Sequence, residues 1–280
     1  MTPSRTARLL LIGCALAAFA GCQRREEPAP QTPATPATEP APALSSQPLS
    51  FEEQTNYASV KLTLPEALRT QPQLHETLYA SSVRELRQYM EGAQADRTEA
   101  GSDSSLPPYE KIITVEPGAD AGTLFSLKRT DYDYSGGAHG NTLFAGVLWD
   151  KAARRQIAAS DLFRPGADTA ALDRALCDAV NTAKQRRSPG TERLTLGNGQ
   201  TWNCPRALQT PMALEPAAGQ PGKAGGLVFL IGPYAVGPYA EGAYQIVLPL
   251  SAFQGLLNPP YAGDFSGAPV RTGDVTPRQG

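Results

Sequence analysis

The short apolar stretch that ends at Cys22 limits where in this chain a fold can begin. Residues 9–20 are apolar, follow Arg5 and Arg8, and are too few to span a bilayer as a helix. A positive start, a short apolar run and small residues before a cysteine are typical of an export signal that is cut away. We therefore expect residues 1–21 to take no part in the mature fold.

Cys22 is the expected site of lipid attachment. The sequence Ala20-Gly21-Cys22 resembles the bacterial lipoprotein box, with Phe19 at the position where leucine is usual. The resemblance implies that Cys22 becomes the new N-terminus and carries acyl chains such as palmitate, which together hold a protein on a membrane surface without crossing it. A plain secretory signal with an incidental cysteine is the alternative. Gln23 stands where aspartate would favour the inner membrane, so we expect attachment to the outer membrane, facing the periplasm.

Two further segments lack the apolar residues needed for a core. Residues 22–50 are rich in Pro, Ala, Thr and Glu, which predicts a disordered tether that extends by roughly 3 Å per residue. Residues 258–280 are rich in Gly, Pro, Asp and Thr without any period, which predicts a disordered tail. The folded part is therefore expected within residues 51–257, a length sufficient for a substantial core.

Strand and helix patterns within that part predict an α+β fold with an antiparallel sheet and two long packing helices. A strand over residues 57–64 and a helix over 72–91 form an expected N-terminal strand–helix unit, residues 51–100. The polar stretch 92–108 separates it from a larger C-terminal sheet unit, residues 101–257. That unit is expected to contain a helix over 168–187 and strands over 109–115, 123–133, 141–149, 155–158, 226–231 and 243–250.

The cysteines indicate one disulfide. Cys14 leaves with the signal and Cys22 takes the lipid, so Cys177 and Cys204 remain in an oxidising compartment and are expected to pair. Closing this loop removes unfolded-chain freedom worth on the order of 3 to 4 kcal/mol on the entropic model. A metal pair or a reactive thiol is the alternative, but the chain has only two histidines and no C-x-x-C sequence.

Composition and charge exclude some partners. The chain has 41% hydrophobic and 19% charged residues, as ordinary globular proteins do. Its formal net charge of −2 becomes −4 when the signal and its two arginines are removed. Because this charge is negative and no basic stripe is present, we expect no nucleic-acid partner.

The order of motifs in the second half resembles that of one family. Residues 134–141 read YSGGAHGN, residues 157–163 read IAASDLF, and residues 232–242 read GPYAVGPYAEG. This order, within residues 57–257, resembles the extracytoplasmic domain of RsiV-type, lysozyme-sensing anti-sigma factors and of related, largely uncharacterised envelope lipoproteins. A related N-terminal unit also precedes some peptidoglycan deacetylase domains.

The resemblance implies a non-enzymatic envelope protein that binds a partner, such as a lysozyme-type muramidase. The lipobox stands where a sigma-binding segment and a transmembrane helix would be, so only the ligand-binding half of the resemblance is expected to apply, without sigma-factor regulation. Binding of peptidoglycan or another glycan is one alternative. A hydrolase that uses His139 is another.

A tyrosine loop contains the first pair of candidate binding residues. Tyr234 and Tyr239 lie in a loop that Pro233 and Pro238 stiffen. Tyrosine supplies a large contact area at a low entropy cost, which suits protein recognition or stacking on a sugar ring. The alternative is that both rings close the end of the sheet as core residues.

A glycine-rich turn contains the second pair, His139 and Asn141. His139 could hydrogen-bond the backbone of the turn, contribute to a binding surface, or join Asp131 and Asp133 as a metal ligand. Ser135 and His139 lack the Gly-x-Ser-x-Gly elbow of a hydrolase. We expect no catalytic residue, no metal and no cofactor.

Overall fold

The computed structural model describes residues 43–99, 101, 107–197, 199 and 201–277. The predicted signal peptide, Cys22 and the tether up to residue 42 lie outside the described residues. The prediction of a disordered tether is wrong for residues 43–50, because the buried Ser45 donates its backbone N–H to the carbonyl of Arg69 at 2.9 Å and a strand begins at Ser50. Within the described ranges, no helix has the length and apolar composition needed to cross a bilayer.

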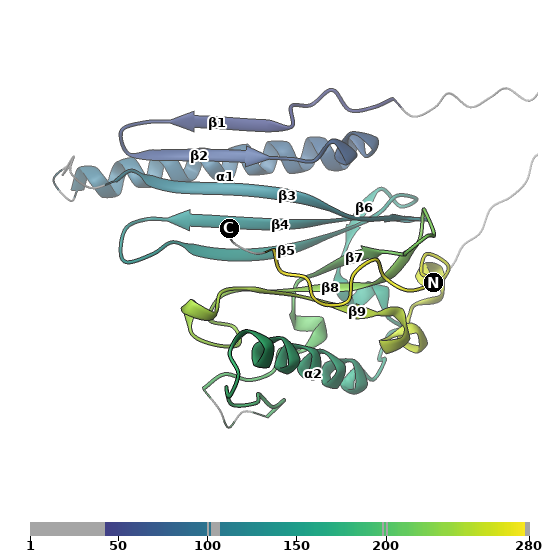
Figure 1. The fold of residues 1–280 in the computed structure, drawn as a ribbon. Coiled ribbons are helices and arrows are strands. Elements are labelled where there is room, and N and C mark those ends of the chain that lie inside the picture. The colour runs from purple at the N-terminus through teal and green to yellow at the C-terminus, as the bar shows by residue number, and fades with distance from the viewer. Residues whose placement is uncertain (1–42, 100, 102–106, 198, 200, 278–280) are drawn as a thin grey trace, which may run out of the picture. The chain divides into compact units, whose positions relative to one another are not determined.

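A six-stranded sheet contains the strands of the first half of the described chain (Figure 1). Its strands follow the order β1-β2-β3-β4-β5-β6, and every neighbouring pair is antiparallel except β2 and β3. A parallel pair needs a long crossover, which α1 supplies between these two strands. The bounds are β1 (Ser50–Gln54), β2 (Ala58–Thr63), α1 (Pro72–Glu99), β3 (Tyr109–Ala121), β4 (Leu124–Tyr134), β5 (Asn141–Asp150) and β6 (Arg155–Ile157).

Helix α1 packs along one face of this sheet and forms the first core. Its buried apolar residues recur at helical spacing and meet β2, β3, β4 and β5. The helix continues beyond the predicted end at residue 91 because Ala93 and Arg97 are also buried on the same face. These buried residues of α1 include Leu74, Leu78, Leu86 and Met90.

A four-stranded sheet and α2 form the second core. The strands follow the order β10-β9-β8-β7, all antiparallel, and α2 lies along β9 (Figure 1). Asp168 accepts a hydrogen bond from the backbone N–H of Ala170 at the start of α2, at 2.9 Å. The bounds are α2 (Ala170–Arg187), β7 (Met212–Pro216), β8 (Ala224–Ile231), β9 (Tyr244–Pro249), α3 (Pro259–Ala262) and β10 (Gly273–Asp274). Short 3-10 turns span Glu66–Thr70, Ala159–Leu162, Ala207–Gln209, Tyr239–Glu241, Leu250–Ala252 and Gln254–Leu256.

The two sheets touch backbone to backbone at one end. A Cβ atom on Gly146 of β5 would lie 1.7 Å from the carbonyl oxygen of Met212 in β7. A Cβ atom on Gly118 of β3 would lie 2.2 Å from Oγ of Ser126, and that hydroxyl accepts a hydrogen bond from Leu214 N at 2.9 Å. Only glycine at these positions permits such a close approach.

The α+β fold class predicted from the sequence is confirmed, but the predicted boundary between the two units is misplaced. β2 pairs with β3, so residues 109–157 share a sheet with the strand–helix unit 51–100. The core of the second sheet and α2 also takes in Ala121, Leu124 and Leu148 of the first sheet. The polar stretch 92–108 resembled a linker between two units because it is polar. It contains the end of α1 and leads to β3 of the same sheet.

The prediction of a disordered tail over residues 258–280 is wrong for residues 258–277. Tyr261 and Asp264 are buried, and the Tyr261 hydroxyl donates to Asp150 at 3.0 Å. The Asp264 carboxylate accepts hydrogen bonds from the backbone N–H and the hydroxyl of Thr123, at 3.1 and 2.6 Å. Polar anchors rather than an apolar pattern hold this segment, so composition alone could not reveal it.

Candidate binding site

The glycine-rich turn and the tyrosine loop meet although they lie on different sheets. His139, between β4 and β5, stacks on Tyr239, between β8 and β9, with ring centroids 3.6 Å apart and planes 13° apart. Tyr234 lies beside both rings, 5.5 Å from Tyr239 and 6.2 Å from His139. We call these three side chains the aromatic cluster. The sequence singled out both motifs but did not predict their contact.

Polar contacts fix the orientation of the His139 ring. Its Nδ1 lies 2.9 Å from the carbonyl oxygen of Gly140, and the Tyr239 hydroxyl donates to the same oxygen at 2.8 Å. Because a carbonyl only accepts, Nδ1 must carry a proton, and in the neutral ring Nε2 is left to accept. Nε2 lies 3.3 Å from the Tyr234 hydroxyl, which therefore donates to it. Both ring nitrogens of His139 therefore have a hydrogen-bond partner.

Tyr234 is held in a costly backbone conformation with its ring toward solvent. Its φ of +66° is in the left-handed region, which costs a non-glycine residue on the order of 1 to 2 kcal/mol. The residue is 54% exposed, and Leu143 of β5 is 58% exposed. Strain of this kind gathers at functional sites because the surrounding structure must hold it in place.

A groove of about 670 Å³ lies beside Tyr234. Leu143, Trp202 and Tyr234 contribute apolar and aromatic surface to it, and Arg206 and Gln209 contribute polar groups. We call this cavity the aromatic groove. The sequence analysis missed Leu143 and Trp202 because a single apolar residue on a strand or in a loop does not reveal its neighbours.

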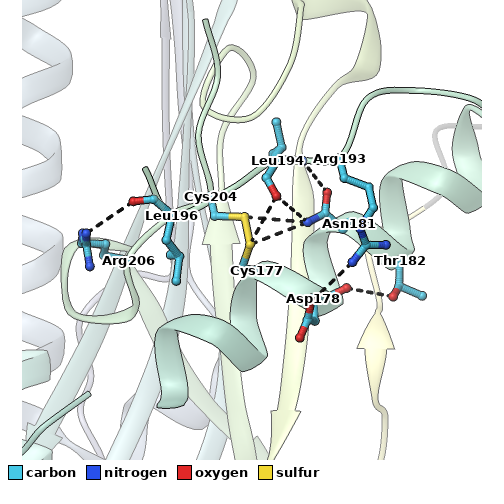
Figure 2. The surroundings of a disulfide bond; sticks show 9 residues. All are labelled: Cys177, Asp178, Asn181, Thr182, Arg193, Leu194, Leu196, Cys204 and Arg206. Atoms are coloured by element: carbon cyan, nitrogen blue, oxygen red, sulfur yellow. Dashed lines mark hydrogen bonds and ion pairs between the residues drawn. A yellow bond between two sulfur atoms is a disulfide. The ribbon is translucent and has the colours of Figure 1, made fainter. Parts of the chain in front are cut away.

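The disulfide fastens Cys204, which lines the groove together with Trp202, to α2 (Figure 2). Cys177 of α2 pairs with Cys204 as the sequence predicted, with their Cα atoms 5.1 Å apart. Next to the disulfide, Asn181 donates to the carbonyl of Leu194 at 3.0 Å and accepts from its N–H at 2.8 Å. The loop between α2 and β7 is therefore fixed to the helix at two points.

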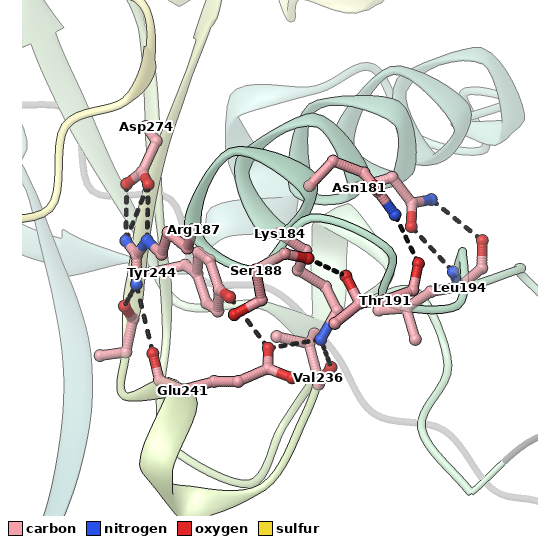
Figure 3. A network of polar contacts seen from close by, with 12 residues as sticks. Asn181, Lys184, Arg187, Ser188, Thr191, Leu194, Val236, Glu241, Tyr244 and Asp274 are labelled. Carbon is pink, nitrogen blue, oxygen red and sulfur yellow. Dashed lines mark hydrogen bonds and ion pairs between the residues drawn. The ribbon is translucent and has the colours of Figure 1, made fainter.

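A buried ion pair holds the tyrosine loop on α2 (Figure 3). Lys184, 4% exposed, lies 2.5 Å from the carboxylate of Glu241 and donates to the carbonyl of Val236 at 2.6 Å. The Tyr244 hydroxyl also donates to Glu241, at 2.9 Å. Burial, together with this hydrogen bond, raises the pKa of Tyr244 well above its usual range. Because Glu241 follows Tyr239 closely in sequence, these contacts also position the aromatic cluster.

Arg187, one turn further along α2, joins the same loop to the C-terminal segment (Figure 3). Its guanidinium lies 3.8 Å from the centre of the Tyr244 ring and donates to the carbonyl of Ala243 at 2.7 Å. It also forms two hydrogen bonds with Asp274, at 2.8 and 2.9 Å. A bidentate contact of this kind fixes orientation as well as distance.

The remaining predicted residues lie apart from the cluster. Asn141 is exposed at the start of β5, opposite Asp133 in the β4–β5 register. Asp131 accepts a hydrogen bond from Arg129 at 2.8 Å, and Arg129 pairs with Glu85 of α1 at 2.6 Å. Asp131 therefore faces α1 and not His139. Across the described ranges, no group of three or more His, Cys, Asp or Glu side chains is placed to hold a metal ion.

Two family models match the chain. Residues 51–142 match the model described as Deacetylase PdaC, and residues 160–251 match the model described as Protein of unknown function (DUF3298). The two matched ranges follow one another along the chain without overlap. The gap between the two matched ranges contains most of β5 and all of β6. The comparison with curated proteins finds no match.

Two solved structures are similar to this chain. One is a member of the DUF3298 family from Bacteroides fragilis NCTC 9343, 17% identical, covering 80% of this chain and 98% of its own, with a TM-score of 0.50. The other is a DUF3298 family protein from Pseudomonas aeruginosa PAO1, 16% identical, covering 81% and 99%, with a TM-score of 0.47. The first similarity shows a shared fold.

Proposed function

We propose that this protein is a non-enzymatic lipoprotein of the bacterial cell envelope that binds an envelope protein through the aromatic cluster and the aromatic groove. The observation that carries the proposal is Tyr234, strained and half exposed, beside the exposed Leu143 at the edge of a groove. An exposed apolar and aromatic surface with a polar rim is the usual composition of a protein interface.

The rigidity of this surface supports a role in recognition. Tyr, Trp and Arg supply most interface hot spots, and Tyr234, Trp202 and Arg206 all line the groove. The disulfide, the Lys184–Glu241 pair and the stacking of His139 hold these groups before any partner arrives. A surface that is already ordered loses less entropy on binding.

The arrangement of His139 supports binding rather than catalysis. Both ring nitrogens are already engaged, one by the Gly140 carbonyl and the other by the Tyr234 hydroxyl. Neither contact supplies a carboxylate that would orient the ring as a general base. Deacetylase is the description of the family that matches residues 51–142, and the deacetylase activity is not part of our proposal for this chain.

We propose a lysozyme-type muramidase as the partner, on the strength of the resemblance to RsiV-type sensors. The DUF3298 match at residues 160–251 covers the tyrosine loop and both cysteines of the disulfide, which is compatible with that resemblance. Lipid attachment at Cys22 would place the domain in the periplasm, tethered to the outer membrane, without sigma-factor regulation.

Binding of a purified lysozyme-type muramidase to the full-length chain tests the proposal. We expect Tyr234→Ala to weaken binding by about 30-fold, because a central hot spot contributes about 2 kcal/mol. Leu208→Ala is the matched control, since Leu208 is 40% exposed but does not line the groove. Absence of binding to the wild type would exclude this partner. Crosslinking in intact cells then tests whether the partner binds at this surface. The assignment of the surface is wrong if the Tyr234→Ala variant captures the same proteins as the wild type.

A further inference from the structure

A second cavity adjoins the aromatic groove, and Thr142, Phe144 and Pro233 line both cavities. Its volume is about 540 Å³, within the range of small-molecule sites. It lies between the six-stranded sheet, the tyrosine loop and the C-terminal segment, and we call it the threonine pocket. Its lining residues are Thr114, Glu116, Thr130, Thr142, Phe144, Pro233, Tyr239, Ala240, Gly242, Ala243, Gln245, Thr276 and Pro277.

Part of the pocket is formed by threonine side chains on the face of the six-stranded sheet that lies away from α1. In β3, Ile113 and Val115 face the core beneath α1, so Thr114 points to the opposite face. Thr114 lies opposite Thr130 of β4, which lies opposite Phe144 of β5, so these three form one row across the strands. The next row on this face is Glu116, Lys128 and Gly146, and at Gly146 the second sheet closes the space. Small hydroxyl side chains leave it open here.

Gln245 of β9 has a buried side-chain oxygen without a hydrogen-bond donor in the described part of the chain, which indicates a ligand. The residue is only 6% exposed, and its side-chain oxygen accepts no hydrogen bond from any part of the chain that the structure describes. Its backbone N–H is already bonded to Thr276 at 2.8 Å. A buried acceptor without a donor is destabilising, and such groups are rare in native structures. A ligand hydroxyl or amide N–H would satisfy this oxygen.

The charge of the pocket selects a neutral ligand. Among the described residues that line it, Glu116 alone carries a charge, and Lys128 lies 3.1 Å from its carboxylate. The ligand therefore needs neither a cation nor an anion to complete the site. What remains is a set of hydroxyl groups that both donate and accept, together with one amide.

The apolar part of the pocket fits the face of a sugar ring. Phe144 stands in the same row as Thr114 and Thr130, and Tyr239 and two prolines, Pro233 and Pro277, add further flat apolar surface to the lining. A pyranose has the same two kinds of surface, with apolar C–H faces and a rim of hydroxyls. We infer that the threonine pocket binds one pyranose unit of a neutral saccharide, with a hydroxyl or acetamido N–H of the sugar donating to Gln245.

Titration of the full-length chain with sugars tests this inference. The probes are N-acetylglucosamine, its trisaccharide and glucose, followed by saturation-transfer NMR in a detergent without a sugar headgroup. We expect Thr130→Val and Gln245→Met each to weaken binding by about fivefold, the loss of one hydrogen bond. Gln245→Met removes an unsatisfied oxygen, so it should not lower the melting temperature. A purely structural role for Gln245 predicts the reverse.

The matched control is Thr63→Val, the same substitution on an exposed strand position outside the pocket. The inference is overturned if no probe binds at about 10 mM, ten times a Kd of about 1 mM, or if both pocket variants bind as the wild type does. Tyr234→Ala separates this site from the proposed protein-binding surface, because Tyr234 does not line the pocket and its loss should leave sugar binding unchanged.

Discussion

The buried pair between Lys184 and Glu241 allows a quantitative test of how the tyrosine loop is held. The side chains are 4% and 14% exposed, so neither charge is well solvated if its partner is removed. Removing one member of a buried pair costs about 3 to 5 kcal/mol. The destabilisation by Glu241→Gln should lie near the lower limit, about 3 kcal/mol, because Lys184 keeps its hydrogen bond to the carbonyl of Val236.

Lys184→Met should cost less, about 2 kcal/mol, because Glu241 is the more exposed partner and keeps the Tyr244 hydroxyl. The double variant Lys184→Met with Glu241→Gln buries no unpaired charge. It should lose only about 1 kcal/mol, so the two single effects are strongly non-additive.

Urea unfolding followed by circular dichroism measures these differences, and the shift in melting temperature should be near 5 to 10 °C for the single variants. The control is Arg193→Met, which removes an exposed cation 3.4 Å from Asp178 and should cost less than about 1 kcal/mol. The argument is refuted if the double variant loses the sum of the two single effects, or if the control loses as much as Glu241→Gln.

Four further predictions concern other parts of the chain. The double variant Cys177→Ser with Cys204→Ser should lower the free energy of unfolding by about 3 kcal/mol, and equal urea midpoints for variant and wild type would contradict this. Burial lowers the pKa of His75, so the unfolded chain takes up its proton first and stability should fall as the pH drops below about 6.5. His75→Gln should reduce that slope in unfolding measurements at several pH values, and an unchanged slope would assign it to other groups. Gly146→Ala should destabilise by at least about 2 kcal/mol, because its Cβ would meet the backbone of β7, whereas Gly255→Ala, with open space around it, is the control in the same melts. Mass spectrometry of the mature protein should find an acylated Cys22, and Cys22→Ser should release the chain from the membrane fraction.

The sequence predicted the elements whose apolar residues recur with a regular period. Helix α2 was expected over residues 168–187 and spans Ala170–Arg187, because its apolar residues recur with the helical period. β1 was missed because it is a polar edge strand, SFEEQ, with four of its five residues exposed. β7 was missed because it is short and ends at Pro216, a residue that argues against a strand.

The candidate site was only half predictable. His139, Tyr234 and Tyr239 stood out as residue types in glycine- and proline-rich loops, which is a local property. Their contact depends on how two sheets pack, and that packing includes close approaches at Gly118 and Gly146 to residues of β7, which no local pattern reveals. Periodicity describes one element at a time and does not specify which faces of two sheets meet.

Polar partners that are far apart in the sequence could not be predicted either. Arg271 forms two hydrogen bonds with the buried carboxylate of Glu215, at 2.8 and 2.9 Å, and neither residue belongs to a recognisable motif. A buried acid is expected to have such a partner, but the sequence does not indicate which basic residue supplies it.

The bonds between Thr123 and Asp264 span 141 positions of the chain, so the order of synthesis constrains assembly. Neighbouring residues are enough to form the β3–β4 hairpin, yet the carboxylate that fastens its turn comes from a segment much further along the chain. Contacts between such distant positions slow folding. Until that segment arrives, the hairpin turn lacks its fastening, and a chain cut before residue 258 would be a substrate for proteases rather than a smaller version of the domain.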